Sequence, residues 1–446
     1  MSEMTVPQQP AYERIFGVRR EELVAVAWSF VYFFCVLSSY YMLRSVRETM
    51  AVEVGFRSIP WLFSGTFLTM LVIAPVFGLL ASRIPRKTLL PWVYVFFVAN
   101  ILIFRVLFWM FPEGAQTTEG VEAFKRVGVG FFIWLSVFNL FVVSVFWSFM
   151  ADIYTKSQSR RLFGFISAGG SAGAIIGPFF ASRMVIPIGF ENMLPISACI
   201  LLVAVVCIGR LKDWVVSEHS RNVDDTVASD HSLGGTWWNG ILSVFRERYL
   251  VWMACGSVIA SLMGTALYLF TAELVTEAIP TTDARVQFFA TIDWITNSVA
   301  FLFQLLVVRH SVERLGLGIT LMIMPVVSII GFILLASHPL LLIFAILTIA
   351  RRAIGFGLTK PTSDMLYSVV PDDQKYKSKN FIDTAVYRGG DLFGAWTVRG
   401  LQTVGLGIAG IALVMVPVGL IWVALAFSLG REYKRRDADS GATHVR

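Results

Sequence analysis

Repeated apolar runs constrain this sequence more than any other feature, because each has about the 20-residue length of a helix that crosses a bilayer. In the first half the runs cover residues 21–43, 60–82, 89–111, 127–151, 162–184 and 194–209. In the second half they cover residues 249–272, 286–308, 317–336, 339–360, 381–401 and 404–429. The sequence therefore predicts an all-α membrane protein with twelve transmembrane helices in two bundles of six.

The composition excludes a soluble enzyme. Hydrophobic residues make up 56% of the 446 residues before the 35 glycines are counted, whereas soluble domains reach about 45–50% with glycine included. Charged residues make up only 15%, against roughly 25% in soluble domains. The histidines and cysteines are scattered without metal-ligand spacing, and no Gly-rich phosphate loop of the GxxxxGKS or GxxxxGKT form occurs. We therefore expect no cofactor, no metal site and no ATP hydrolysis.

The basic residues indicate the orientation in the membrane. The net charge is +7, but Lys and Arg gather at the ends of apolar runs, so topology explains them better than nucleic-acid binding. Most of them fall in segments that lie inside when the N-terminus is cytoplasmic. The first twenty residues lack the apolar core and cleavage site of a secretory signal. The sequence predicts a multi-pass protein of the bacterial inner membrane, in contact with lipid, with both termini in the cytoplasm.

The two halves are predicted to form separate bundles. We expect an N-terminal six-helix bundle at 1–209, and a C-terminal six-helix bundle with a cytoplasmic tail at 249–446. The stretch 210–248 has few apolar residues before Trp237, which is typical of a cytoplasmic linker. Its end, 237–249, places aromatic and aliphatic residues on one side of a helix, as in an interfacial helix. For the oligomeric state, a monomer is our working expectation.

A loop after span two resembles the signature loop of the major facilitator superfamily. It reads GLLASRIPRKTLL from Gly78 to Leu90. The positions that match the superfamily are Gly78, Arg83, Arg86 and Lys87, whereas Ser82 and Pro85 stand where it usually has Asp and Gly. As an alternative, the basic residues simply anchor the loop on the inner side of the membrane.

Span five, FGFISAGGSAGAIIGP, is similar to the glycine-rich, proline-ended fifth helix of the same superfamily. Its small residues are Ala168, Gly169, Gly170, Gly173 and Gly177, and Pro178 follows them. Small residues let helix backbones approach closely, and proline kinks a helix. We expect packing and gating geometry from this helix rather than contact with solute. The resemblance implies twelve helices in two bundles and transport by alternating access.

Three further stretches resemble the ATP/ADP translocase family of plastids and obligate intracellular bacteria, together with its relatives in free-living bacteria. In SSYYMLRSVRETMAV the matching residues are Tyr41, Leu43 and Arg44, while Tyr40, Arg47 and Glu48 stand for Asn, Lys and Asp. In SVFWSFMADIYTKSQSRRLFGF they are Phe146, Trp147, Phe149, Ala151, Arg161 and Phe163. In KYKSKNFIDTAVYRGGD they are Lys375, Lys377, Lys379, Ile382, Asp383, Arg388 and Gly390. Asp391 then stands where the translocases carry Lys.

Ionisable residues inside or at the mouths of the spans form the candidate site. A charge at mid-bilayer costs about 2.5–3.5 kcal/mol on insertion scales, so each such group must pair or face water. Guanidinium groups suit phosphate or carboxylate. From position and resemblance together, we expect solute-binding cations at Arg44, Arg47, Arg351, Arg352, Lys379 and Arg388. We expect coupling or gating carboxylates at Glu48, Asp152, Asp293, Asp383 and Asp391.

Structural roles compete with these assignments. The arginines could form interhelical salt bridges, and Lys379 could belong to a topological anchor with Lys375 and Lys377. Arg351 and Arg352 are adjacent and therefore about 100° apart around a helix, so at most one can point directly at a central cavity. Asp391 could simply pair with Arg388, which lies three residues earlier.

These features predict a secondary transporter, not an enzyme, that moves a small anionic solute, with nucleotides and phosphate esters as candidates. Because Asp391 replaces a Lys of the translocases, we expect a solute less charged than ATP, or a proton carried on Asp391. Two other classes remain open at this point. One is a transport-dead sensor or partner subunit, and the other is a membrane enzyme acting on lipid phosphate.

Overall fold

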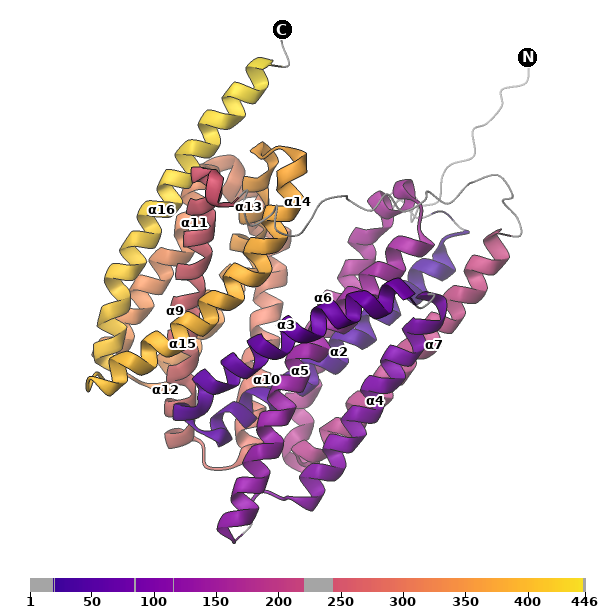
Figure 1. Ribbon diagram of the computed structural model, residues 1–446, viewed down its shortest axis with the longest axis vertical. Coiled ribbons are helices and arrows are strands. Elements are labelled where there is room, and N and C mark those ends of the chain that lie inside the picture. The colour runs from indigo at the N-terminus through magenta and orange to yellow at the C-terminus, as the bar shows by residue number, and fades with distance from the viewer. Residues whose placement is uncertain (1–18, 20, 84–85, 115, 220–243, 444–446) are drawn as a thin grey trace. The chain divides into compact units, whose positions relative to one another are not determined.

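The computed structural model describes residues 19, 21–83, 86–114, 116–219 and 244–443 (Figure 1). All regular elements in these ranges are helices, and no strand occurs in them. Contacts divide the chain into two compact units. Unit 1 consists of Met1–Arg47 and Val72–Asp230, and unit 2 consists of Glu48–Leu71 and His231–Arg446. The predicted division at 1–209, 210–248 and 249–446 stays a prediction, and most of the linker with its interfacial helix lies outside the described residues.

The helices account for the twelve predicted spans. Ten described helices are long and apolar enough to cross a membrane. One of them, Thr282–Ser337, has 56 residues and covers two predicted spans, at 286–308 and 317–336. Gly316 separates these two with a φ of 78°, a left-handed conformation that glycine adopts without strain. The predicted span at 381–401 is helical too, but it carries too many charged residues to count among the ten apolar helices. The all-α fold of about twelve spans is therefore confirmed.

Unit 1 contains the first six long helices or parts of them. They are α2 (Leu23–Val54), α3 (Ile59–Arg83), α4 (Arg86–Met110), α5 (Thr118–Ile153), α6 (Lys156–Ile188) and α7 (Phe190–His219). Figure 1 shows α4 and α7 side by side. Helix α6 begins at a capping box. The side chain of Thr155 accepts a hydrogen bond from the backbone N–H of Gln158, and the side chain of Gln158 accepts one from the backbone N–H of Thr155. It ends at Gly189, whose φ is 81°.

The glycines of α6 bring it into backbone contact with α2. A Cβ on Gly177 would lie 2.5 Å from the carbonyl oxygen of Ser38, and one on Gly173 would collide with the carbonyl oxygen of Phe34. Gly169 meets the carbonyl oxygen of Phe30 in the same way. The close approach predicted for this helix is confirmed, and its partner is the first span.

Unit 2 contains the remaining helices, several of which include a wider π-helical turn. The long helices are α9 (Arg248–Ala278), α10 (Thr282–Leu302), α11 (Val308–Ser337), α12 (Leu341–Ile354), α15 (Tyr387–Thr403) and α16 (Ile408–Thr443). The short ones are η1 (Phe56–Ser58), α13 (Lys360–Met365), η4 (Leu366–Val369) and α14 (Asp372–Phe381). The π-helical turns are η2 (Phe303–Val307), η3 (Gly355–Thr359) and η5 (Ile382–Val386). Such turns are frequent at functional sites.

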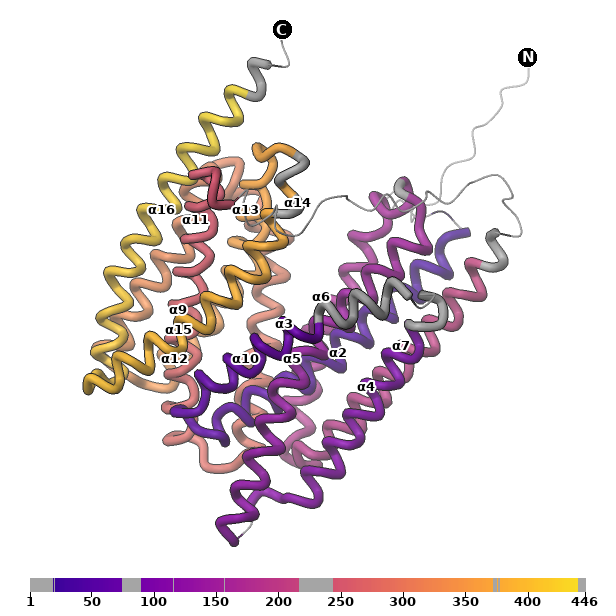
Figure 2. Tube along the Cα trace, viewed as in Figure 1, coloured from indigo at the N-terminus to yellow at the C-terminus, as the bar shows by residue number. Residues whose placement is uncertain are grey.

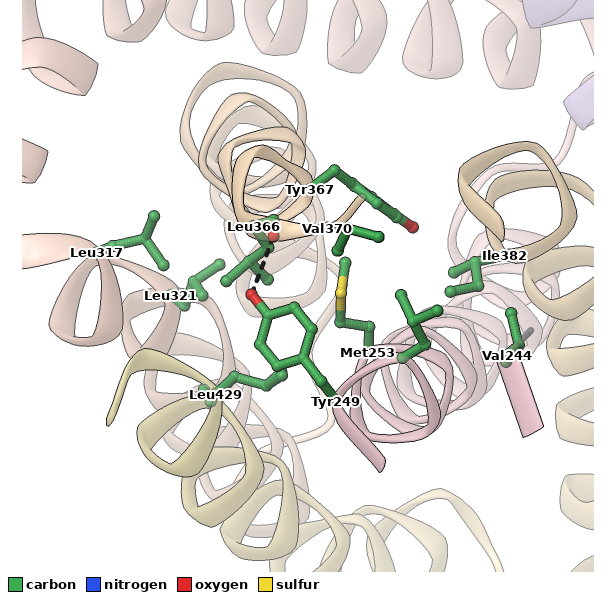
Figure 3. Close-up of a cluster of buried hydrophobic side chains, with 12 residues drawn as sticks. Val244, Tyr249, Met253, Leu317, Leu321, Leu366, Tyr367, Val370, Ile382 and Leu429 are labelled. Atoms are coloured by element: carbon green, nitrogen blue, oxygen red, sulfur yellow. Dashed lines mark hydrogen bonds between the residues drawn. The ribbon is translucent and has the colours of Figure 1, made fainter. Parts of the chain in front are cut away.

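A cluster of buried side chains packs the start of α9 against its neighbours (Figure 3). The hydroxyl of Tyr249 donates to the carbonyl oxygen of Leu366 at 3.0 Å, which joins α9 to η4. Leu317 and Leu321 on α11 and Leu429 on α16 complete one side of the cluster. Helices α11 and α16 run side by side (Figure 2), with Gly318 and Gly430 where they meet.

The segment Glu48–Leu71 belongs to unit 2 through polar contacts with distant parts of the chain. The carboxylate of Glu53 pairs with Arg285 at 2.5 Å and accepts a bond from the hydroxyl of Thr282 at 2.9 Å. The indole N–H of Trp396 donates to the hydroxyl of Ser64 at 3.2 Å. The end of the first span and the start of the second are therefore fastened to α10 and α15.

Candidate functional site

Two adjacent arginines on α12 reach different neighbouring helices. Arg351 is 7% exposed and donates through Nη2 to the carbonyl oxygen of Ala260 on α9. Arg352 pairs with Asp293 on α10, with 2.7 Å between Nη2 and Oδ1, and the Asp293 side chain is only 1% exposed. The different directions follow from the helix geometry, because adjacent residues lie about 100° apart around the axis. Together, Arg351 and Arg352 therefore connect α12 to both α9 and α10.

Asp391 enters the contact between α15 and α9. Its Oδ1 accepts bonds from the hydroxyls of Ser261 and Thr265, the latter at 3.4 Å. Its Oδ2 lies 3.5 Å from Nη1 of Arg388, whose side chain is 45% exposed. Gly390 precedes Asp391 and lets the helices come close, because a Cβ there would lie 2.9 Å from the Cβ of Ser261. The Asp391 carboxylate is thus held by hydroxyls of α9, and its pairing with Arg388 on its own helix is loose.

These side chains make up one charged cluster within unit 2. Arg351 and Asp391 are close enough for their charges to interact, and the ring of Tyr387 lies within electrostatic range of the three arginines and of Asp391. We call this group the arginine–aspartate cluster; its members are Asp293, Arg351, Arg352, Tyr387, Arg388 and Asp391. Three arginines against two aspartates leave one net positive charge when both carboxyls are ionised.

Lys379 and Asp383 lie in a second group, in which the charges balance. Lys360 contacts Asp383 at 2.5 Å and Asp364 at 3.2 Å, and Lys379 contacts Asp364 at 3.0 Å. All four side chains are between 36% and 48% exposed. We call them the lysine–aspartate row. Because each lysine already has a carboxylate neighbour, an anion would have to compete with Asp364 or Asp383 for it.

The remaining predicted site residues lie elsewhere. In unit 1, Arg47 donates to the hydroxyl of Ser136 at 3.3 Å and stacks over Phe132 with 4.7 Å to the ring centre. Arg44 lies over the ring of Tyr41 at 5.6 Å. Asp152, at the end of α5, is exposed.

Glu48 lies in unit 2 and lines a small, mostly apolar cavity that has no room for a water molecule. The carboxylate residue is buried, with 5% exposure. Tyr268 and Thr271 of α9 line the same cavity, as does Phe289 of α10. The gating role expected for Glu48 stays a prediction.

The second translocase-like stretch has a packing role in unit 1. The ring of Phe146 stacks on Phe33 with 4.1 Å between centres, and Trp147 contacts Phe163 at 5.3 Å. Arg161 pairs with Glu22 at 2.8 Å. These contacts join α2, α5 and α6 at one end of the unit.

Three residues of the cluster environment were missed by sequence reasoning. Ser261 and Thr265 are ordinary hydroxyl residues in an apolar span, and Tyr387 has the aromatic character of many span residues. A signal was present, because Ser261 and Thr265 are four residues apart and share a helix face. Among the described residues, no group of three His, Cys, Asp or Glu side chains could hold a metal ion.

Comparison with known families decides the class of the protein. The family model of the Major Facilitator Superfamily matches residues 28–395. The chain belongs to this superfamily. The predicted fold class is confirmed at the family level, and so is the predicted function of secondary transporter of a small solute. Because members of the Major Facilitator Superfamily are transporters, the protein is not an enzyme.

Similar proteins include ADP,ATP carriers of two Chlamydia species, which the chain matches over most of their length. The chain is 20% identical to ADP,ATP carrier protein 2 of Chlamydia pneumoniae over 487 aligned positions, covering 93% of this chain and 89% of the relative. It is 19% identical to ADP,ATP carrier protein 1 of Chlamydia muridarum, covering 94% and 90%. The predicted resemblance to the ATP/ADP translocases is therefore confirmed.

Solved structures of transporters share the superfamily fold. The nucleoside transporter NupG superposes with a TM-score of 0.57 at 17% identity, covering 94% of this chain and 99% of NupG. A bacterial homologue of the iron transporter ferroportin, in an inward-facing state, superposes with a TM-score of 0.64 at 11% identity, covering 92% and 98%. At these identities the likeness concerns the fold.

Proposed function

We propose that this superfamily member moves a small anionic solute, a nucleotide or another phosphate ester, across the bacterial inner membrane by alternating access. The observation that carries the proposal is the arginine–aspartate cluster, in which Arg388 is half exposed and only loosely paired with Asp391. A planar guanidinium with free N–H groups suits a phosphate oxygen pair. The similarity to ADP,ATP carriers supports the same class of solute.

The charge of the cluster favours a solute with fewer charges than ATP. A nucleoside triphosphate carries several negative charges, whereas the cluster has one net positive charge. Asp391 stands where the translocases carry Lys, and two unit charges 4 Å apart interact by about 4 kcal/mol at an effective dielectric constant of 20. A monophosphate, or a more charged solute accompanied by a proton on Asp391, therefore fits better than ATP alone.

We assign each predicted site residue a role in this transport process. Arg351, Arg352 and Arg388 supply positive charge, with Lys379, Arg44 and Arg47 as further solute-binding candidates. Gating or coupling falls to Glu48, Asp152, Asp293, Asp383 and Asp391. The unit proposed to carry out transport is a monomer surrounded by lipid.

Both termini are proposed to be cytoplasmic, because basic residues are concentrated in the segments that this orientation places inside. A reporter that is active only in the periplasm, fused after Arg436, tests the orientation. Activity of that reporter would contradict it.

Uptake into proteoliposomes tests the proposed function. Purified wild-type protein should accumulate radiolabelled AMP or a sugar phosphate saturably, with ATP taken up less well. Vesicles without protein supply the background. Arg309→Gln serves as a matched variant, because Arg309 is 82% exposed and pairs with Glu313, four residues away on the same helix. No saturable uptake of any phosphate ester, nucleotide or organic acid would contradict a transporter of anions, and would favour a sensor or partner subunit.

A further inference from the structure

Helix α9 contacts two opposite charges through neighbouring strips of its surface. Ala260 and Gly264 are four residues apart and both contact Arg351. Ser261 and Thr265 follow each of them by one residue and bind Asp391. Residues four apart lie on the same face of a helix, so the two strips lie next to each other. No ion pair between Arg351 and Asp391 forms among the described residues, because each is held by α9.

Gly264 leaves the space in which the guanidinium of Arg351 lies. A Cβ at this position would be 2.7 Å from Nη1, 3.2 Å from Nη2 and 3.4 Å from Cζ of Arg351. The first of these distances is shorter than real Cβ contacts, so any side chain would displace the guanidinium. Alanine is also the better helix former by about 1 kcal/mol, so helix propensity does not explain a glycine here.

The position of Arg351 depends on this space more than on its other contacts. Its Nη2 donates to the carbonyl oxygen of Ala260, but its buried Nε has no hydrogen-bond partner among the described residues. The guanidinium is therefore held by one backbone bond and by its packing against Gly264. Moving it would change both that bond and its interaction with Asp391.

We propose that Gly264 is a positioning residue for transport, because it seats Arg351 and so fixes one positive charge of the arginine–aspartate cluster for the anion. This inference rests on the proposed function. Gly264 does not contact the solute itself; it acts through Arg351. The role differs from general helix packing, because it requires the arginine to be present.

Gly264→Ala is the direct variant, and Gly256→Ala is its control on the same helix. A Cβ on Gly256 would meet only the indole nitrogen of Trp422, at 4.0 Å. With radiolabelled AMP as the probe, Gly264→Ala should raise KM about tenfold, the effect of weakening a charged hydrogen bond, while kcat changes little. Gly256→Ala should leave KM within about twofold of the wild type.

A double-mutant cycle with Arg351→Lys separates the positioning of Arg351 by Gly264 from helix packing at Gly264. The lysine ammonium is compact and lacks the planar fork, so it does not need the space that Gly264 leaves. On the Arg351→Lys background, Gly264→Ala should then change KM and Tm by much less than it does in the wild type. Equal penalties on both backgrounds would mean that Gly264 only packs helices, and the inference would be wrong.

The cycle remains decisive if a variant is unstable. If Gly264→Ala cannot be purified, the Gly264→Ala/Arg351→Lys protein should be, because the collision is removed. Failure of both to fold would overturn the seating role. Absence of saturable uptake of any phosphate ester, nucleotide or organic acid by the wild type would instead overturn the proposed function, whereas the Tm cycle, which needs no solute, would still show whether Gly264 positions Arg351.

Discussion

The contact between α2 and α6 in unit 1 and the contact between α9 and α15 in unit 2 use the same spacing of glycines. Gly169 and Gly173 lie four residues apart on α6, and Gly390 and Gly394 lie four apart on α15. On α6 the glycines meet backbone atoms of the apolar stretch from Phe30 to Ser38. On α15 the glycines flank Asp391, which binds hydroxyls of α9.

The difference shows what each interface contributes. In unit 1 the glycines of α6 bring its backbone close to that of α2, and the contact consists of packing. In unit 2 the same approach brings a carboxylate onto a helix that also holds Arg351. Burying charge is costly unless it is well paired, so this contact should stabilise the fold less than the apolar contact in unit 1. The solute binding proposed for the arginine–aspartate cluster would account for the charge.

The largest expected effect comes from Arg352→Gln in unit 2. The variant leaves the carboxylate of Asp293, which is 1% exposed, without its arginine. Breaking a buried pair by removing one partner costs about 3–5 kcal/mol. The Tm in detergent should fall steeply, and Asp293→Asn/Arg352→Gln should recover most of the loss. A Tm that is unchanged by Arg352→Gln would show that Asp293 is not stabilised by this pair.

A smaller effect is expected from Gly173→Ala in unit 1. The new Cβ would collide with the carbonyl oxygen of Phe34, and overpacking of this kind costs typically about 1–3 kcal/mol. Gly164→Ala on the same helix is the control, because a Cβ there meets nothing within 4 Å. Thermal unfolding of the two variants measures the difference. Equal Tm values would mean that α2 and α6 are not in backbone contact.

The smallest effect compares a hydroxyl bond between α2 and α7 in unit 1 with a hydroxyl that binds Asp391 in unit 2. Ser39 and Ser197 in unit 1 share a 2.7 Å bond, so Ser39→Ala should cost about 0.5–1.5 kcal/mol of stability and leave the affinity for AMP unchanged. Ser261→Ala removes a donor from Asp391 and should change that affinity. Titration of both variants with AMP compares them. If Ser39→Ala shifts the affinity as much as Ser261→Ala, the hydroxyl that binds Asp391 has no particular part in binding AMP.

Much of the fold could be predicted from the sequence, because span length and apolar character are local properties of the chain. The twelve spans and the close packing of span five follow from runs and spacings of this kind, whereas the superfamily came from the resemblance of the 78–90 loop and of span five to its motifs. The attachment of Glu48–Leu71 to unit 2 could not be predicted. It depends on partners such as Arg285 and Trp396, which are hundreds of residues away.

The candidate site was predictable only by residue type. Buried arginines and aspartates stand out in apolar runs, but their partners do not. Arg351 and Arg352 are neighbours in sequence and bind different helices, while Lys379 lies in the lysine–aspartate row, whose charges balance. The π-helical turns η3 and η5 shift the register of the residues beyond them, and no local pattern predicts such turns. Gly264 looks like any small residue in a span until the guanidinium beside it is seen.

The central claim is that the arginine–aspartate cluster binds the anion, and the affinity of Arg388→Gln for AMP tests it most directly. Arg388 is the most exposed of the three arginines in the cluster, so its loss should disturb the fold least. Equilibrium binding of AMP should weaken by about tenfold or more in Arg388→Gln, as expected for a lost charged hydrogen bond, while Arg309→Gln binds like the wild type. Binding by Arg388→Gln as tight as that of the wild type would contradict the claim.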